Sequence, residues 1–287
     1  MTKETHKSGT LYLVPTPIGN LDDMTFRAVK ILQEVDVIAS EDTRNTQKLL
    51  NHFDIHTPQV SYHEHNEFER AEELVTRLLS GESVAQVSDA GTPCISDPGT
   101  HLVRQAIQAG VTIVPLPGAN AALTALIASG LTAENFTFVG FLSRSKKDRQ
   151  KELSQWRNHQ ETLIFYESPH RLKKTLIDML DVFGPDRQMA ICRELTKKYE
   201  EFVRGDIQYV YDWASENLVR GEFVLVVSGN PNPEMEQNFD IEESVADHVK
   251  RLMEEQNIKP KAAIKQVAKA RNIKTSDVYD EYHELNK

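Results

Sequence analysis

The sequence predicts an α/β protein of two lobes, each built on its own sheet, followed by a small helical module. Three observations predict this. The length of 287 residues is about twice that of a typical domain; short apolar runs alternate with amphipathic segments; and a polar stretch, SGNPNPEMEQNFD, shows no apolar period. We place the lobes at residues 8–118 and 119–232 and the module at residues 240–287.

Five apolar runs in the first lobe are predicted strands. TLYLV at residues 10–14 comes first, and DVIAS, QVSY, SVAQVS and VTIVPL follow it. The segments between them are predicted helices, including one in which Phe26, Val29, Ile31 and Leu32 share an apolar side. Strands that alternate with helices pair in parallel, because each helix carries the chain back across the sheet. We therefore expect a parallel sheet with helices on both faces.

The second lobe repeats this pattern with strands FTFVGF, TLIFYES, QMAICRE and EFVLVVSG and a helix at HRLKKTLIDMLDVF. Its later strands follow one another closely enough to permit some antiparallel pairing. Residues 240–285 are expected to form about three helices, with Ser276 capping the last one. Two short helices with a basic surface are typical of a helix-turn-helix, and a tail that packs a dimer or clasps the lobes fits equally well.

Composition excludes several classes of protein. No apolar run reaches the roughly 20 residues that cross a bilayer, and MTKETHKSGT lacks the apolar core of a signal peptide. The two cysteines, Cys94 and Cys192, do not provide a disulfide framework, so we expect a cytoplasmic protein with reduced thiols. The net charge of −10 argues against a protein that coats nucleic acid through bulk charge, although residues 257–274 carry six basic and no acidic side chains.

Loops rich in Gly and Pro follow three strands of the first lobe: PTPIGN, SDAGTPCISDPG and PLPGANA. The carboxyl ends of parallel strands meet at one edge, so we expect these loops to converge on a ligand. Gly91 and Gly99 let the backbone approach that ligand, and Asp89 and Asp97 accept hydrogen bonds from an amine or from ribose hydroxyls. An ordinary tight loop capped by Asp is the alternative. Neither a Rossmann glycine pattern nor a P-loop is present.

Charged and polar groups follow other strands, at EDTR (41–44), HEHN (63–66) and YESPHR (166–171). Substrate contact is one interpretation, and helix capping or solvent exposure is the alternative for the first group. The two histidines do not predict a metal, because no Cys-rich or HExxH spacing accompanies them. Basic residues in the second lobe predict either a face for an anionic partner or an ordinary solvated helix surface.

Eight segments, in their order and spacing, closely resemble the ribosomal RNA small subunit methyltransferase I family, of the tetrapyrrole methylase superfamily. They are TPIGNLDDMTFRA, ASEDTR, SYHEHN, SDAGTPCISDPG, PGANAALTAL, GFLSR, TLIFYESPHR and RELTKKYEE. The resemblance spans residues 10 to about 230. It implies S-adenosylmethionine bound between two lobes, a homodimer, and 2′-O-methylation of a cytidine in the decoding region of 16S rRNA within the small ribosomal subunit. The first loop departs from the glycine-rich version of the tetrapyrrole-modifying relatives.

The donor-binding positions that the resemblance implies lie in both lobes, together with the GEFVLVV strand. They are Pro17, Asp89, Gly91, Thr92, Pro93, Ile95, Ala119, Asn120, Ala121, Leu142, Tyr166 and Ser168.

Transfer of a methyl group to a ribose hydroxyl benefits from a general base and needs no metal, because the thioether leaves as a neutral group. The candidates for the base are Glu41, Asp42, His63, His65 and Glu167, with none preferred. An unpaired nucleotide is the expected target, and its phosphates have candidate contacts in Arg44, Arg144, Arg171, Lys261, Lys265 and Lys269. Methylation of a small tetrapyrrole or of a protein side chain, or a DNA-binding regulator that senses a ligand, are the alternatives.

Overall fold

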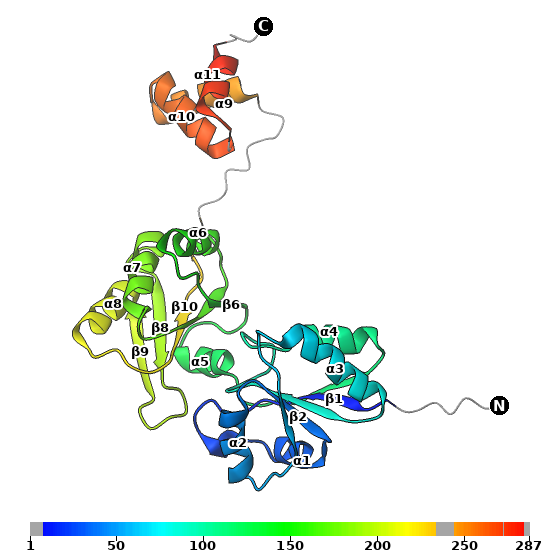
Figure 1. The fold of residues 1–287 in the computed structure, drawn as a ribbon. Helices are drawn as coiled ribbons and strands as arrows, with labels where there is room; N and C mark the ends of the chain where they lie inside the picture. The colour runs from blue at the N-terminus through cyan, green and yellow to red at the C-terminus, as the bar shows by residue number, and fades with distance from the viewer. Residues whose placement is uncertain (1–7, 234–243, 272, 284–287) are drawn as a thin grey trace, which may run out of the picture. The chain divides into compact units, whose positions relative to one another are not determined.

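The structure is a computed structural model that describes residues 8–233, 244–271 and 273–283, without the side chains at 269 and 270. The chain divides into two compact units, Met1–Pro233 and Glu234–Lys287. The first unit contains two sheets and the second is helical (Figure 1). The predicted fold class, α/β with two sheets followed by helices, is confirmed. The boundary between lobes at residue 118 stays a prediction.

The first sheet has the strand order β3-β2-β4-β1-β5, and every neighbouring pair is parallel. A 3-10 turn, η1 (Leu21–Asp23), precedes its first helix. The elements in chain order are β1 (Thr10–Leu13), α1 (Phe26–Glu34), β2 (Val37–Ser40), α2 (Thr43–His52), β3 (Gln59–Ser61), α3 (Glu67–Leu79), β4 (Val84–Val87), α4 (Thr100–Gln108) and β5 (Thr112–Pro115).

Burial explains why these segments form a parallel sheet. All residues of β2 and β4 are buried, because helices cover both faces of the sheet. The side chains of Thr25 and Asp42 accept hydrogen bonds from the first turns of α1 and α2 and so fix where these helices begin. The prediction that Phe26 lies on the buried side of α1 is wrong, since it is 97% exposed. As the first residue of the helix, it projects toward the N-terminal end, past the packed face.

The second sheet has the order β6-β7-β10-β8-β9, in which β6 and β7 are parallel and the other pairs antiparallel. The predicted mixture of pairings is therefore present. Its elements are α5 (Ala121–Ser129), β6 (Phe136–Phe141), α6 (Lys146–Trp156), β7 (Thr162–Glu167), α7 (Leu172–Phe183), β8 (Gln188–Arg193), β9 (Glu201–Asp206), α8 (Ile207–Glu216) and β10 (Phe223–Val227).

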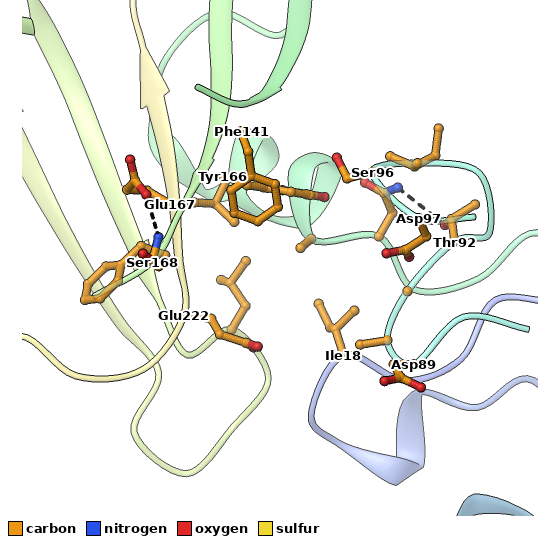
Figure 2. A pocket seen from close by; sticks show the side chains of 18 of the residues that line it. Ile18, Asp89, Thr92, Ser96, Asp97, Phe141, Tyr166, Glu167, Ser168 and Glu222 are labelled. Atoms are coloured by element: carbon orange, nitrogen blue, oxygen red, sulfur yellow. Dashed lines mark hydrogen bonds between the residues drawn. The ribbon is translucent and has the colours of Figure 1, made fainter. Parts of the chain in front are cut away.

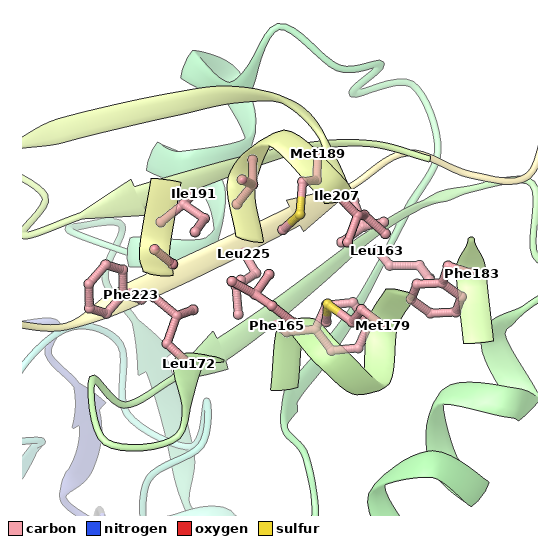
Figure 3. Packing of buried hydrophobic residues seen from close by; sticks show 14 of the residues in the cluster. Leu163, Phe165, Leu172, Met179, Phe183, Met189, Ile191, Ile207, Phe223 and Leu225 are labelled. Atoms are coloured by element: carbon pink, nitrogen blue, oxygen red, sulfur yellow. The ribbon is translucent and has the colours of Figure 1, made fainter. Parts of the chain in front are cut away.

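Two apolar clusters hold this sheet. One face packs against α6, α7 and α8 through Phe165, Leu225, Met179 and their neighbours (Figure 3). The other face packs against α5, an apolar helix that places Ala125 over the sheet. The edge strand β9 was not predicted, because only Val203 of its six residues is buried and three of the others, Glu201, Arg204 and Asp206, are charged.

The described residues of the second unit form three helices, α9 (Val245–Gln256), α10 (Pro260–Arg271) and α11 (Thr275–Tyr282), around a small apolar core. This agrees with the three helices expected. The prediction that Ser276 caps the last helix is wrong, because Lys274 occupies the cap position and Ser276 lies inside the first turn. In the described ranges, no helix is long and apolar enough to span a membrane.

Candidate active site between the two sheets

A cavity of about 500 Å³ opens between the loops of the first sheet and the strand ends of the second (Figure 2). Its volume lies in the range that suits a small-molecule ligand. The residues that line it are Ile18, Glu41, Asp89, Ala90, Gly91, Thr92, Ile95, Ser96, Asp97, Asn120, Ala121, Phe141, Tyr166, Glu167, Ser168, Pro169, Cys192, Leu195, Glu222, Phe223 and Val224.

The three Gly- and Pro-rich loops meet at this cavity. Thr16 and Gly91 form an isolated antiparallel bridge between the first two loops. The hydroxyl of Thr92 donates to the carbonyl oxygen of Ala119 at 3.0 Å, which ties the third loop to the second. The side chain of Asn120 accepts from the N–H of Leu123 and so begins α5 at the cavity edge. Convergence of the loops therefore follows from specific hydrogen bonds.

Residues 88–99 adopt unusual backbone conformations. Cys94 and Ser96 have φ of 71° and 61°, values that favour glycine, and Gly91 has φ of 86°. Strained residues of this kind cluster at ligand sites. Gly99 does not serve the predicted close approach to a ligand. A Cβ atom there would lie 2.1 Å from Nε2 of Gln86, so this glycine is required by packing beneath the loop.

Five lining residues are acidic, and no lining residue in the described part of the chain is basic. The acidic residues are Glu41, Asp89, Asp97, Glu167 and Glu222. Such a wall favours a ligand with positive charge. Apolar side chains from both lobes complete the lining, so the cavity suits a ligand that is partly apolar and partly cationic.

Three of these acids, Glu41, Asp89 and Asp97, belong to the first lobe, and two of them have raised pKa values. Burial, with a further contribution from the charge of Glu41, raises the pKa of Asp97 to about 7. Burial likewise raises the pKa of Glu41, whose Oε2 accepts from the N–H of Asp89 at 3.3 Å. Asp89 accepts hydrogen bonds from the N–H of Asp42 and the side chain of Asn45. Asp97 is thus poised to exchange a proton near neutral pH, and the raised pKa of Glu41 makes that carboxyl a weaker acid than usual.

Glu167 lies on the second-lobe wall with both oxygens already used. Oε1 accepts from the N–H of Ser168 at 2.8 Å and lies 3.4 Å from Nε of Arg171. Oε2 accepts from the hydroxyl of Thr175 at 2.5 Å. The residue is only 3% exposed. These contacts suit a carboxylate that holds the start of α7 in place.

The structure places eight of the twelve predicted donor-binding residues on the cavity wall: Asp89, Gly91, Thr92, Ile95, Asn120, Ala121, Tyr166 and Ser168. Four lie elsewhere. Pro17 lines a smaller neighbouring cavity, and Pro93 is buried. Ala119 offers its carbonyl oxygen to Thr92, and Leu142 packs into the core of the second sheet.

Among the predicted bases, Glu41 and Glu167 line the cavity, whereas Asp42, His63 and His65 do not. Asp42 caps α2 and pairs with Arg44, whose guanidinium lowers the pKa of that carboxyl to about 2. The rings of His63 and His65 contact each other in the loop before α3, with their centroids 5.9 Å apart. Asp42 therefore caps a helix, which is the alternative to substrate contact that the sequence left open.

The predicted phosphate contacts have different surroundings. The Arg44 side chain is 85% exposed and bonds to Asp42. Arg144 is exposed, and Arg171 donates to the carbonyl oxygens of two neighbouring residues. In the second unit the side chains of Lys261 and Lys265 are exposed on α10, while the side chain of Lys269 lies outside the described residues.

Several lining residues were not predicted. Four of them lie in segments that carry the family resemblance: Ile18, Ser96, Phe141 and Pro169. Their position in these segments is the signal in the sequence that could have identified them. Cys192 lies in β8 and Leu195 two residues after its end, in the segment RELTKKYEE, which carried the family resemblance without any residue in it being assigned to a ligand. Within the described ranges, no group of three or more His, Cys, Asp or Glu side chains is arranged to hold a metal ion.

Comparison with known proteins is consistent with this architecture. The family model for tetrapyrrole (corrin/porphyrin) methylases matches residues 10–210. Among solved structures, cobalt precorrin-4 methyltransferase aligns with a TM-score of 0.58 at 18% identity over 76% of this chain and 94% of that one. Uroporphyrin-III C-methyl transferase from Thermus thermophilus, complexed with S-adenyl homocysteine, aligns with a TM-score of 0.55 at 18% identity over 77% and 97%.

Relatives of much higher identity carry one name. Ribosomal RNA small subunit methyltransferase I of Bacillus subtilis (strain 168) is 53% identical over 96% of this chain and 94% of its own length. The protein of that name from Streptococcus pyogenes serotype M3 is 50% identical over 99% and 98%. With matches of this extent, the chain belongs to the tetrapyrrole methylases and, among them, to the ribosomal RNA small subunit methyltransferase I family.

Proposed function

We propose that this chain transfers the methyl group of S-adenosylmethionine to the ribose 2′-oxygen of a cytidine in the decoding region of 16S rRNA. The observation that carries the proposal is the 53% identity, along 96% of the chain, to a ribosomal RNA small subunit methyltransferase I. The bound donor supplies a methyl group on a positively charged sulfur, with a neutral thioether as the leaving group.

The cavity residues fit such a donor. The acidic residues of the first-lobe wall, Asp89 and Asp97 among them, offset the positive charges of a sulfonium and an ammonium group. Ile18, Tyr166 and Val224 offer apolar surface to an adenine ring and an aliphatic stem. Because the loops are tied by backbone and side-chain hydrogen bonds, the wall is formed before the donor arrives.

The chain's own contribution to the reaction is positioning and proton removal. Orientation of the reacting groups is worth up to ~7–11 kcal/mol in well-oriented intramolecular reactions. A ribose hydroxyl attacks efficiently once its proton is taken, and a carboxylate with a pKa near the working pH serves this purpose best. Asp97 meets that condition with its pKa of about 7, assisted by Glu41. Glu167, whose oxygens are occupied, holds the second-lobe wall.

The proposed partner is the 16S rRNA of the small ribosomal subunit, encountered in the cytoplasm, where ribosomes assemble. The basic surface of α10, with Lys261 and Lys265 exposed, supports contact with phosphates. A homodimer is also proposed. It is supported by the outer side of α5, a mostly apolar helix on which the side chains of Leu123 and Ile127 are 49% and 80% exposed.

Incubation with labelled S-adenosylmethionine tests the proposal. The purified chain is offered, in separate reactions, small ribosomal subunits that lack the methyl group, naked 16S rRNA, a tetrapyrrole and a protein extract. We expect label in the RNA. Label in the tetrapyrrole or in protein instead would establish one of the alternative methyl acceptors. Absence of any transfer, together with tight binding of one duplex DNA sequence, would establish a ligand-sensing regulator.

A further inference from the structure

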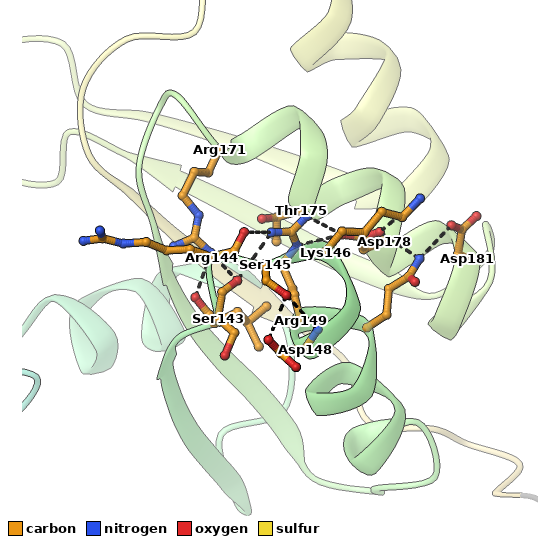
Figure 4. A network of polar contacts seen from close by, with 12 residues as sticks. Ser143, Arg144, Ser145, Lys146, Asp148, Arg149, Arg171, Thr175, Asp178 and Asp181 are labelled. Carbon is orange, nitrogen blue, oxygen red and sulfur yellow. Dashed lines mark hydrogen bonds and ion pairs between the residues drawn. The ribbon is translucent and has the colours of Figure 1, made fainter.

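The loop between β6 and α6, residues 142–145, is held by two arginines. Nη2 of Arg171 donates to the carbonyl oxygens of Leu142 at 2.7 Å and Ser143 at 3.1 Å. Nη1 of Arg149 donates to those of Ser143 at 3.4 Å and Arg144 at 3.2 Å. Three successive carbonyl groups are therefore fixed by charged donors (Figure 4).

Both arginines are anchored in turn. Arg149 is 4% exposed, and its Nε and Nη2 lie 2.7 and 2.5 Å from Oδ2 of Asp178, which is 1% exposed. Arg171 pairs with the buried Glu167. A loop tied to such buried ion pairs keeps one conformation, so any side chain that it presents to solvent is already positioned for a ligand.

The side chain that this loop presents is Arg144. It is exposed, and within the described part of the chain its guanidinium has no hydrogen-bond or ion-pair partner. In Figure 4 it extends away from the network that fixes its backbone. A preorganised, unpaired guanidinium on a rigid loop is well suited to bind a phosphate.

Phe141 lies directly before this loop and reaches the cavity because of a β-bulge. Phe138 pairs in register with Ile164 and Phe141 pairs with Tyr166, so one extra residue lies between them. Without that residue, side chains three positions apart would point to opposite faces of the strand. The bulge brings both phenylalanines to the same face, where their rings contact Tyr166 with centroids 5.0 and 5.5 Å away.

Gly140 permits this bulge with a φ of 77°, and a Cβ atom at this position would lie 3.3 Å from Oγ of Ser96 in the first lobe. The aromatic ring that follows thus lies where the two lobes approach each other. Phe141 lines the cavity and is nevertheless 59% exposed (Figure 2). A large apolar ring at the cavity edge is available for a flat ligand to cover.

We propose that Phe141 and Arg144 together receive the target nucleotide. The base stacks on the ring of Phe141, and the guanidinium of Arg144 binds the adjacent phosphate. This inference rests on the proposed function, since it takes RNA as the substrate. An aromatic platform beside a cation is the general means of binding a single-stranded nucleotide. S-Adenosylmethionine has no phosphate, so the pairing of ring and arginine favours RNA over the donor's adenine. Arg149 and Arg171 act as positioning residues.

Methylation kinetics on small ribosomal subunits, with calorimetric titration of S-adenosylmethionine, test the proposal. Phe141→Ala is expected to raise KM for the subunit about 5- to 150-fold, the range for one lost stacking contact, and to leave donor affinity unchanged. Phe141→Leu keeps apolar bulk without the ring and should behave like the alanine variant, whereas Phe141→Tyr should restore KM. Phe26→Ala, which removes an exposed ring from α1, is the matched control.

Arg144→Ala should raise KM and reduce the slope of log KM against log salt by about 0.7–0.9, the change for one phosphate contact. Arg104→Ala, at an exposed position on α4, is the control. Arg171→Ala should change KM and the salt slope in the same way, and the double variant should lose no more than Arg144→Ala alone, because Arg171 acts through the loop. A purely structural role would lower the melting temperature and leave the salt slope unchanged.

Two results would overturn the inference. The first is a Phe141→Ala variant that weakens donor binding and leaves KM for the subunit unchanged, since the ring would then belong to the donor site. The second is wild-type kinetics in either the Phe141→Leu or the Arg144→Ala variant. A wild-type protein that labels no RNA would overturn the proposed function itself. This outcome is distinguishable from the other two, because it needs no comparison with a variant.

Discussion

Thr16 and Gly91 exchange a pair of backbone hydrogen bonds across two loops of the first lobe. The N–H of Thr16 donates to the carbonyl oxygen of Gly91 at 2.9 Å, and the N–H of Gly91 donates back at 3.0 Å. The hydroxyl of Thr16 also donates to the carbonyl oxygen of Ser88. The segment that carries Asp89 is therefore fixed on both sides by hydrogen bonds to Thr16, without help from the acidic side chains. Changes to its side chains should alter binding and catalysis more than folding.

The rate of methyl transfer should depend on the ionisation of Asp97. Burial raises its pKa to about 7, and the carboxylate accepts a proton only when it is ionised. At donor concentrations well below saturation, where the ionisation of the free enzyme governs the rate, the rate should therefore rise with pH through about 7 and level off above it. Asp97→Asn should lower kcat about 10²–10⁴-fold and abolish this rise. Single-turnover rates between pH 5.5 and 9 measure both effects.

Glu41→Gln provides the control for this profile. The charge of Glu41 contributes to the raised pKa of Asp97, so its removal should move the rise in rate to lower pH. An Asp97→Asn variant with the wild-type pH profile would show that another group takes the proton.

Asp97 should also reduce the stability of the unliganded protein. Its pKa is about 7 in the folded state against an ordinary value of 3.8, so unfolding releases a proton between these pH values. The free energy of unfolding should fall as pH rises through this window and then stay constant. Asp97→Asn should melt at a higher temperature than wild type at pH 8, and the difference should vanish toward about pH 4. Equal melting temperatures at pH 8 would contradict this account.

The buried pair of Arg149 and Asp178 should be essential to the second lobe. Arg149→Ala leaves a carboxylate that is 1% exposed with only the amide of Gln150 and the more distant ammonium of Lys146, and should cost about 3–5 kcal/mol of unfolding free energy. Replacement of both residues by Met and Leu should recover much of this loss. Urea unfolding gives the free energy of unfolding of the wild type, the Arg149→Ala variant and the double variant.

The pair of Lys30 and Glu34 is the matched control, because both side chains are more than half exposed. Glu34→Ala should change stability by at most ~1 kcal/mol. A similar small loss for Arg149→Ala would mean that the pair does not hold the lobe.

Much of the fold was predictable because burial leaves a periodic signal. The largely apolar β2 and β4 indicated strands buried on both faces, as in a parallel sheet, and all of their residues are buried. The signal failed where burial is partial. β9 lies at a sheet edge with charged side chains, and Phe26 lies at a helix end where helical periodicity no longer determines what it packs against.

The candidate site was predictable where the chain departs from ordinary composition. Residues 88–99 stood out by their Gly, Pro and Asp content, and several of them line the cavity. Phe141 could not be assigned, because its direction depends on a bulge that no sequence period reveals. Arg171 was predicted to bind phosphate because it is charged and lies near a strand end. Its partners, the carbonyl oxygens of Leu142 and Ser143, are distant in the sequence and become neighbours only in the folded chain.

Removal of the second unit tests its proposed role in RNA binding. The three helices form a core of their own, so a chain that ends before Ile241 should keep the cavity intact. We expect weaker binding of small-subunit RNA, a shallower salt dependence and unchanged donor affinity, because phosphate contacts are lost. Filter binding at several salt concentrations, with calorimetry for the donor, provides the comparison. Equal RNA affinity of the two proteins at every salt concentration would refute this role.

The chemical position of the transferred methyl group tests the central claim most directly. After reaction of small ribosomal subunits with labelled S-adenosylmethionine, the RNA is digested to nucleosides and analysed by mass spectrometry. The account predicts a single labelled product, cytidine with the methyl group on its ribose 2′-oxygen. A labelled methyl group on a base, or on a ribosomal protein, would contradict it.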